Sequence, residues 1–296
     1  MVLYPREVNG KKLSDFDPIN EDILEKLKQV GIAATVKGVE YHSLPSKEAL
    51  RTDWILKIDV TVEGNEQGKS YVDYGLEMAS PPYFYDEASR KAIETVVRTL
   101  RKNYLVRVNN STGLHVHVGN GYFGLQWKVL RNLMAIAWTY ERQIRLIVPR
   151  ERISMNYCRS LRASSLGTSF PQYTRLEFLN RILSFSSNQD IVSELDAAST
   201  GRLGFNIRDL RVPYEVDRRT IEFRQHSGSL DPEAILHWVH VCVKLVERAC
   251  LTKDDDALYA RLRADVEKSI GFGDDEVSIT DYLMWLGCPA QSVLLR

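Results

Sequence analysis

The chain has 296 residues and equal numbers of basic and acidic side chains, 39 of each, so its formal net charge is zero. Nucleic acids and anionic membranes select proteins with a basic excess, and the balance argues against both kinds of partner. The N-terminus lacks a basic segment followed by an apolar one, and no apolar run approaches the roughly 20 residues that cross a bilayer. The four cysteines form no CxxC pair, which suits a reducing compartment. These features predict a cytoplasmic protein.

The first third of the chain predicts two helices separated by strands. Apolar residues recur at helical spacing over residues 21–30, and Gly31 then ends the pattern. Asp86 is a suitable N-cap for a helix that continues to about residue 102. Strand patterns are found at residues 33–37, 54–62 and 71–80.

The rest of the chain predicts long helices around a few short strands. Residues 149–181 are rich in arginine, serine and tyrosine and predict a loop with a short helix near 174–181. Pro232 suits the first position of a further helix. The other predicted helices lie near 125–147, 188–198, 254–270 and 279–287, and the strands near 113–119, 203–208 and 219–225. A hairpin through Pro213 is expected between the last two strands.

The order of these elements predicts a single α+β domain over residues 1–296. No internal repeat and no long linker divides the chain. We expect a mostly antiparallel sheet with helices packed on one side, a core at about residues 50–250 that carries the motifs, and C-terminal helices at 254–290.

The run GLHVHVG at residues 113–119 is the most informative segment of the chain. Its alternation of apolar and polar residues predicts a strand, on which His115 and His117 project to the same face. The two imidazoles then converge on one metal ion or one anionic ligand. The simpler interpretation is a half-buried strand whose two polar side chains face water.

Three other predicted strands carry charged residues where a core strand should be apolar. These residues are Asp59, Glu77, and the pair formed by Glu222 and Arg224, which share one face of their strand. If the strands lie side by side with the histidine strand, their polar faces line one cavity. Carboxylate and imidazole groups suit Mg²⁺ or Mn²⁺, and arginine suits phosphate. Local breaks in the apolar rule tend to mark functional sites.

Each of these residues also has a structural alternative. Asp59 could end a strand at a turn, and Glu77 could form an ion pair with Arg224 across the sheet. His237 and His240 lie on the polar side of a helix and are interpreted as structural. By alternation, His226 is expected on the face of Glu222 and Arg224, at the end of the strand.

Three motifs in order resemble a known family. They are GLEMASP at residues 75–81, GLHVHVG at 113–119 and TIEFR at 220–224. Together they resemble the amidoligase family that is abundant in fungi, within the glutamine synthetase and glutamate–cysteine ligase superfamily of carboxylate–amine ligases. The resemblance covers roughly residues 50–250. It implies a curved antiparallel sheet like the glutamine synthetase catalytic domain, with ATP and two or more divalent ions on the concave face.

The resemblance also implies roles for single residues. Arg224 would bind the transferred phosphoryl group, and His117 would face ATP or the substrate. Arg152 lies in the segment after the long helix, where the family also carries arginine. Carried over in this way, the ligands of Mg²⁺ or Mn²⁺ would be Glu77, one of the two histidines (His115 or His117), Glu222 and Asp59.

The implied reaction is amide formation by a carboxylate–amine ligase. ATP phosphorylates a carboxylate of a small molecule or peptide, and an amine then displaces the phosphate. The resemblance also allows a homo-oligomer. One departure concerns the start of the chain, because family members usually open with a Glu-x-Glu strand and this chain opens with MVLYPREVNG.

Two alternatives to the ligase are left open by the sequence. One is a divergent protein of the same fold that lacks ATP-dependent ligation, either a binding protein or an enzyme with different chemistry in the same cavity. The other is a single-metal His-x-His enzyme. A cupin would need a glutamate soon after the histidines, and residues 119–123 contain none. An amidohydrolase would need a long barrel of alternating elements, which this chain lacks.

Overall fold

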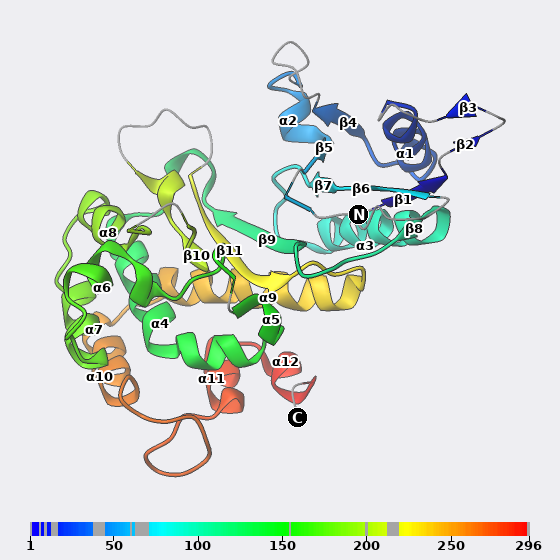
Figure 1. The fold of residues 1–296 in the computed structure, drawn as a ribbon. Coiled ribbons are helices and arrows are strands. Elements are labelled where there is room, and N and C mark those ends of the chain that lie inside the picture. Colours follow the sequence, from blue (N-terminus) through cyan, green and yellow to red (C-terminus); the bar gives the residue numbers. More distant parts are fainter. Residues whose placement is uncertain are drawn as a thin grey trace. The chain divides into compact units, whose positions relative to one another are not determined.

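The fold is seen in a computed structural model that describes residues 2–5, 7–8, 11–12, 17–37, 45–59, 61–62, 71–153, 155–198, 201–211 and 219–294 (Figure 1). Its contacts group into two compact units. Unit 1 comprises Met1–Thr112 and Gly228–Leu236, and unit 2 comprises Gly113–Ser227 and His237–Arg296. The predicted α+β class is confirmed in both. That the chain forms a single domain remains a prediction.

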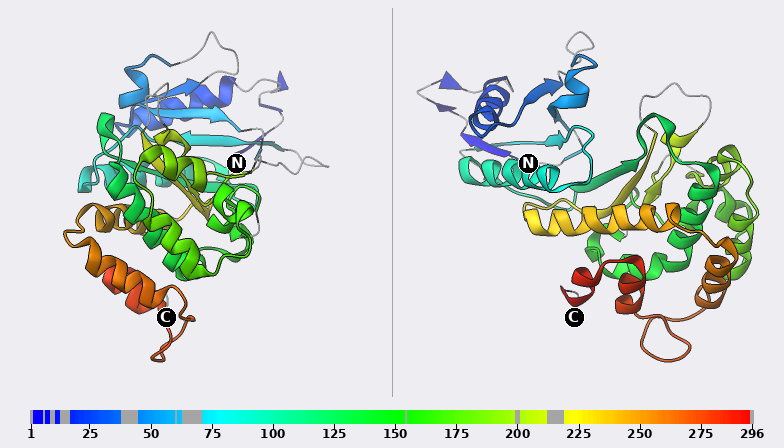
Figure 2. Two further views of the ribbon diagram at one scale, coloured as in Figure 1. Left: turned by 90° about the vertical axis from the view of Figure 1, so that its left-hand side faces the viewer. Right: turned by 180° about the vertical axis from the view of Figure 1, so that it is seen from behind.

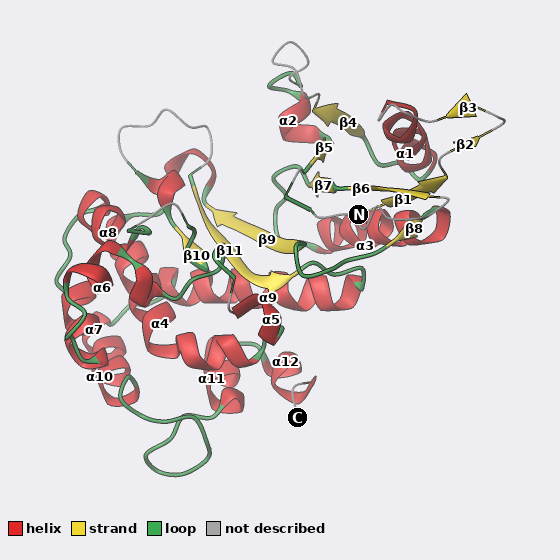
Figure 3. Ribbon diagram, viewed as in Figure 1, coloured by secondary structure: helices red, strands yellow, loops and turns green. Residues whose placement is uncertain are grey.

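The described strands form four small sheets, where one continuous curved sheet was predicted (Figure 3). Every pairing is antiparallel except that of β4 with β5, so the mostly antiparallel character is confirmed. Unit 1 contains the sheets β6-β1-β8, β4-β5-β7 and β2-β3, and unit 2 contains β10-β11-β9. The strands are β1 Val2–Pro5, β2 Glu7–Val8, β3 Lys11–Lys12, β4 Ala34–Lys37, β5 Trp54–Ile58, β6 Tyr71–Tyr74, β7 Leu76–Ala79, β8 Leu105–Val106, β9 Gly113–Gly119, β10 Phe205–Asn206 and β11 Thr220–Ser227.

Unit 1 is held together by two amphipathic helices, α1 Asp17–Gln29 and α3 Glu87–Asn103. The predicted N-cap of α3 is confirmed, because the Asp86 side chain accepts a hydrogen bond from the Ser89 amide at 2.8 Å. The short helix α2 Ala49–Thr52 precedes β5. The buried core of this unit consists of Ile19, Ile23, Leu27, Trp54, Leu56 and Val96.

Two predicted strands of unit 1 are shorter than their sequence patterns. β5 ends at Ile58, and the run at residues 71–80 divides into β6 and β7 at Gly75. A Cβ atom on Gly75 would lie 2.5 Å from the carbonyl oxygen of Asp59, so no larger residue fits there without movement. β1 was not predicted. It lies between β6 and β8 and has the sequence VLYP.

Unit 2 is a small sheet surrounded by helices, as the two views in Figure 2 show. The long helix α4 Trp127–Leu146 is almost wholly buried along its middle, and α7 Arg175–Leu183, α8 Asn188–Leu195, α10 Asp255–Asp265 and α11 Ile279–Leu286 pack around it. The apolar faces of β9 and β11 belong to the same core as α4 and α9. The remaining α-helices of the described residues are α5 Arg150–Ile153, α6 Ser165–Ser169, α9 Pro232–Cys250 and α12 Pro289–Leu294.

The segment predicted as a loop at residues 149–181 contains α5 and α6 as well as the start of α7. Helices of four or five residues are too short to show periodicity in the sequence. The start of α7 carries a capping box, in which Thr174 and Glu177 each satisfy the other's backbone N–H. The hairpin expected near residue 213 lies outside the described residues. None of the described helices is long and apolar enough to span a bilayer.

Candidate functional site

The predicted histidine strand β9 pairs with β11, so the two motifs of unit 2 lie next to each other (Figure 1). Glu222 stands directly opposite His117, and Phe223 stands opposite Val116. Since opposed residues of an antiparallel pair project to the same face, one face of this pair is polar and the other is apolar. The sequence predicted both faces.

A β-bulge interrupts the pairing beside the site. Phe223 opposes Val116 but His226 opposes Leu114, so two residues of β11 face one residue of β9. Bulges bend a strand and redirect its side chains. The extra residue moves His226 to the face of Leu114, where its ring lies 5.6 Å from that of Trp238. The expectation that His226 shares the face of Glu222 is therefore wrong.

Glu222 is the centre of the polar face and is only 8% exposed. Its Oε1 accepts a hydrogen bond from Nη1 of Arg224, and its Oε2 accepts one from Nδ2 of Asn206 at 2.6 Å. Burial disfavours the charged form of Glu222. The charge of Arg224 and the hydrogen bond from Asn206 outweigh this effect and hold the pKa of Glu222 below its ordinary value.

Asn206 is in turn fixed by residues that follow β10. Its Oδ1 accepts from the backbone amide of Arg208 at 3.3 Å, which sets the orientation of the amide group. The Arg208 side chain donates from Nε to both carboxylate oxygens of Asp196, at 2.8 and 2.7 Å. This series of contacts anchors the group that holds Glu222.

Arg152 reaches the same face from helix α5 and is 4% exposed. Its Nε donates to the carbonyl oxygen of Arg224 at 3.2 Å, and its Nη2 lies 3.2 Å from Nε2 of His115. The Arg224 side chain also donates from Nε to the carbonyl oxygen of Tyr157 at 3.0 Å. Each arginine side chain is therefore held by a backbone carbonyl oxygen as well as by another side chain.

His115 lies between Arg152 and Glu222. Its Nδ1 is 3.3 Å from Oε1 of Glu222. Burial, together with the positive charges of Arg224 and Arg152, lowers the pKa of His115 from 6.5 to about 4. The imidazole is therefore neutral at physiological pH.

His117 lies one step further along β9 and contacts Thr220. Its Nδ1 is 2.9 Å from the Thr220 hydroxyl, and its Nε2 is 3.7 Å from Oε1 of Glu222. Both histidines thus face the same carboxylate oxygen. We call His115, His117, Arg152, Glu222 and Arg224 the β9–β11 cluster.

The β9–β11 cluster does not have the arrangement of a divalent metal site. Among the described residues, no group of three or more His, Cys, Asp or Glu side chains is placed to hold a metal ion. Both oxygens of Glu222 accept hydrogen bonds, and both ring nitrogens of His115 face other side chains of the cluster. A divalent cation there would also lie beside two guanidinium groups. Ligation of Mg²⁺ or Mn²⁺ by His115 and Glu222 remains a prediction.

The two other predicted ligands, Glu77 and Asp59, belong to unit 1. Glu77 on β7 opposes Lys57 on β5, and their side chains form an ion pair at 2.8 Å. Asp59 follows the end of β5, where its Oδ1 accepts from the amide and the hydroxyl of Thr61, at 2.9 and 2.6 Å. These are the contacts of a strand-end turn, the structural alternative considered for Asp59. A metal role for either residue remains a prediction.

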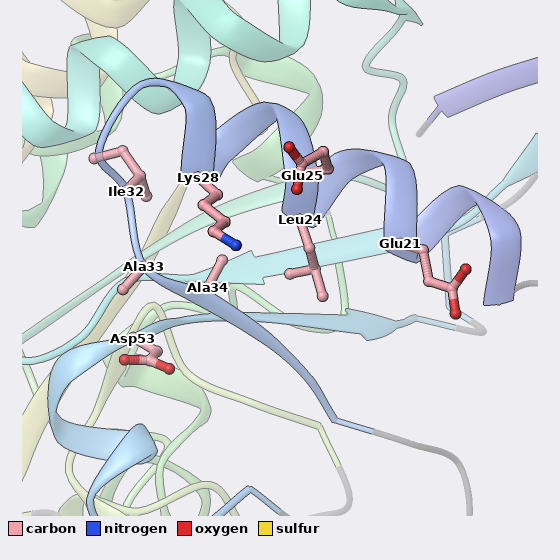
Figure 4. Close-up of a pocket in the computed structure, with 8 residues that line it drawn as sticks. All are labelled: Glu21, Leu24, Glu25, Lys28, Ile32, Ala33, Ala34 and Asp53. Atoms are coloured by element: carbon pink, nitrogen blue, oxygen red, sulfur yellow. The ribbon is translucent and has the colours of Figure 1, made fainter.

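Unit 1 also has a groove of about 420 Å³ between α1 and the start of β4 (Figure 4). Its apolar part is formed by Leu24, Ile32 and two alanines. The charged residues that line it are Glu21, Glu25, Lys28 and Asp53. None of these residues was predicted to be functional, and exposed charges of both signs are common on a solvated helix face.

Behind the bulge, unit 2 encloses a very small cavity next to Gln225. The volume that the centre of a water molecule can occupy in this cavity is about 10 Å³. Glu141, Ser160 and Gly204 are among the lining residues. Gln225 is 4% exposed, and both its Oε1 and its Nε2 lack a hydrogen-bond partner. Burial raises the pKa of Glu141, although hydrogen bonds from Ser160 and from the Leu161 amide oppose the rise.

Comparison with known proteins agrees with the motifs of the sequence. Residues 19–246 match the family described as "Putative amidoligase enzyme". The chain belongs to this amidoligase family. The match covers part of each unit and all members of the β9–β11 cluster. No curated protein and no solved structure matches this amidoligase.

Two parts of the candidate site were missed in the sequence. Asn206 is a single polar residue in a short strand, and nothing in its local pattern shows that its partner lies sixteen residues later. Thr220 was included in a motif but was given no role. Alternation along β11 places Thr220 on the face of Glu222, and that signal could have identified it.

Proposed function

We propose that this amidoligase joins a carboxylate to an amine with ATP as the source of energy, acting on a small molecule or a peptide. The observation that carries the proposal is the convergence of Arg152 and Arg224 on Glu222 and two histidines within a member of this family. Fixed guanidinium groups suit a reaction in which negative charge moves between phosphate and carboxylate.

The proposed reaction has two steps. A carboxylate oxygen attacks the γ-phosphorus of ATP, the bond to the β-phosphate oxygen breaks, and an acyl phosphate and ADP result. The amine nitrogen then attacks the acyl carbon, the carbon–oxygen bond to phosphate breaks, and the amine loses a proton to a base. In both steps Arg152 and Arg224 would hold oxygens of the phosphoryl group. Mg²⁺ or Mn²⁺ is part of the proposal as the ion that accompanies ATP.

The test measures ADP release and amide product together. The protein would be incubated with ATP, Mg²⁺ and a panel of amino acids and amines, and products would be identified by mass spectrometry. We expect ADP and an amide in equal amounts, with both reduced at least a hundredfold in Glu222→Ala. Folded protein that hydrolyses no ATP and binds no ATP at millimolar concentration would refute the proposal.

A second candidate is a protein of the same family that binds anions without ligation. It is favoured by the poor fit of the β9–β11 cluster to a divalent ion among the described residues. In the same assay this candidate gives ATP or phosphate binding with neither ADP nor amide. The two outcomes separate the candidates.

A further inference from the structure

We propose that the β9–β11 cluster binds an oxyanion directly through Arg152 and Arg224, with no metal ion between them, and that His115 and Glu222 form a hydrogen-bonded brace that orients the two arginines. The identity of the anion as a phosphoryl or carboxylate group of the ligase reaction rests on the proposed function. The binding itself does not.

The proton positions of the brace follow from the chemistry of arginine. A guanidinium group has only N–H donors, so Nε2 of His115, which lies 3.2 Å from Nη2 of Arg152, must accept. The proton of the neutral ring is then on Nδ1, where it points to Oε1 of Glu222 at 3.3 Å. His115 has no nitrogen lone pair left for a metal ion. It links one arginine to the carboxylate that holds the other.

The charge of the cluster favours an anion. The cluster contains two guanidinium groups and one carboxylate, so its arginine and glutamate side chains together carry one positive charge in excess. Arg152 is 4% exposed, and Glu222 is 8% exposed. A buried charge without a counter-charge is costly, and a bound anion removes that imbalance whereas a divalent cation increases it.

Each arginine keeps donors for such a ligand. Within the described part of the chain, Arg224 uses Nε for the Tyr157 carbonyl and Nη1 for Glu222, which leaves Nη2. Arg152 uses Nε and Nη2, which leaves Nη1. Planar guanidinium groups bind two oxygens of a phosphate or carboxylate at once.

The first experiment is calorimetric titration with inorganic phosphate in the presence of EDTA, with acetate as a parallel ligand. We expect phosphate to bind without metal, and Arg224→Gln and Arg152→Gln each to weaken its binding at least tenfold. The matched control is Arg263→Gln, because Arg263 is an exposed arginine of α10 that contacts only Asn180 among the contacts described for it. It should leave the affinity unchanged. If acetate binds more tightly than phosphate, the anion is the substrate's carboxylate and not the phosphoryl group.

The second experiment measures Mn²⁺ binding to the protein alone by electron paramagnetic resonance. We expect Mn²⁺ binding to be unchanged within twofold in His115→Gln and in Glu222→Gln. Loss of a bound Mn²⁺ in either variant, with the fold intact by circular dichroism, would overturn the proposal. Phosphate binding that disappears in EDTA would overturn it as well.

A charge-conserving variant distinguishes a lost binding site from a misfolded protein. Arg224→Lys retains the positive charge but loses the planar fork, so it should weaken phosphate at least fivefold while the protein stays folded. The oxyanion-site proposal and the ligase proposal can be refuted independently of each other. Metal-free phosphate binding without ATP turnover would leave the oxyanion site standing, whereas turnover with a Mn²⁺ ion on His115 would refute the site and leave the ligase.

Discussion

Nδ2 of Asn206 lies 2.6 Å from Oε2 of Glu222, so a neutral amide on β10 fixes the carboxylate at the centre of the cluster. This contact leaves Oε1 to be shared by Arg224 and the two histidines. Asn206 therefore determines how Glu222 presents its second oxygen to the rest of the site.

Removal of the Asn206 side chain should destabilise the fold. Asn206→Ala leaves a largely buried carboxylate oxygen without its donor, and the loss of one partner of a charged hydrogen bond amounts to about 1–3 kcal/mol. Urea unfolding measures this change. The matched control is Asn180→Ala, since Asn180 is an exposed residue of α7. Equal and small effects of the two substitutions would show that the Asn206 contact contributes nothing.

The neutral His115 should make the protein sensitive to acid. The pKa of His115 in the folded protein is about 4, below its ordinary value of 6.5. As the pH falls, the unfolded chain therefore binds a proton at this ring before the folded protein does. Stability from this residue is therefore complete above about pH 6.5 and is lost as the pH falls towards 4. A shift of this size corresponds to at most about 3 kcal/mol, and solvent screening of this partly exposed ring makes the change smaller.

The experiment compares urea unfolding of the wild type and His115→Gln between pH 7 and pH 4. We expect the wild type to lose more stability over this interval than the variant, because glutamine does not titrate. Parallel curves for the two proteins would contradict a neutral His115 with a lowered pKa.

The cavity beside Gln225 should hold one ordered water. A buried side-chain amide whose oxygen and nitrogen both lack hydrogen-bond partners is unfavourable. The volume open to the centre of a water molecule, about 10 Å³, is close to the smallest that holds one water. A crystal structure at about 1.8 Å resolution should show a water hydrogen-bonded to Gln225. The Gln225→Met variant, which lacks the amide, should have lost it. An empty cavity in the wild type would contradict this expectation.

Alternation along single strands was enough to predict the faces of this site. His115 and His117 share a face on β9, and Glu222 and Arg224 share one on β11, because strand geometry follows from neighbouring residues alone. The pairing of β9 with β11 joins segments about a hundred residues apart. Its register and its bulge depend on that pairing, and therefore His226 was assigned to the wrong face.

Contacts made by loops and short helices were the least predictable part. Arg152 was selected through the family resemblance, but its contact with His115 depends on α5, a helix of four residues with no periodic signal. Asp59 and Glu77 have partners within unit 1, Thr61 and Lys57, that the sequence pattern did not identify. Polar residues on strands thus indicated candidates, and only the fold shows which of them contact one another.

The most direct test of the account is calorimetric titration of the folded protein with ATP and Mg²⁺, on the wild type and on Arg224→Gln, with Arg263→Gln as the control. We expect ATP to bind to the wild type and to the control with equal affinity, and at least tenfold more weakly to Arg224→Gln. Absence of ATP binding to the wild type, or equal binding by all three proteins, would contradict the account.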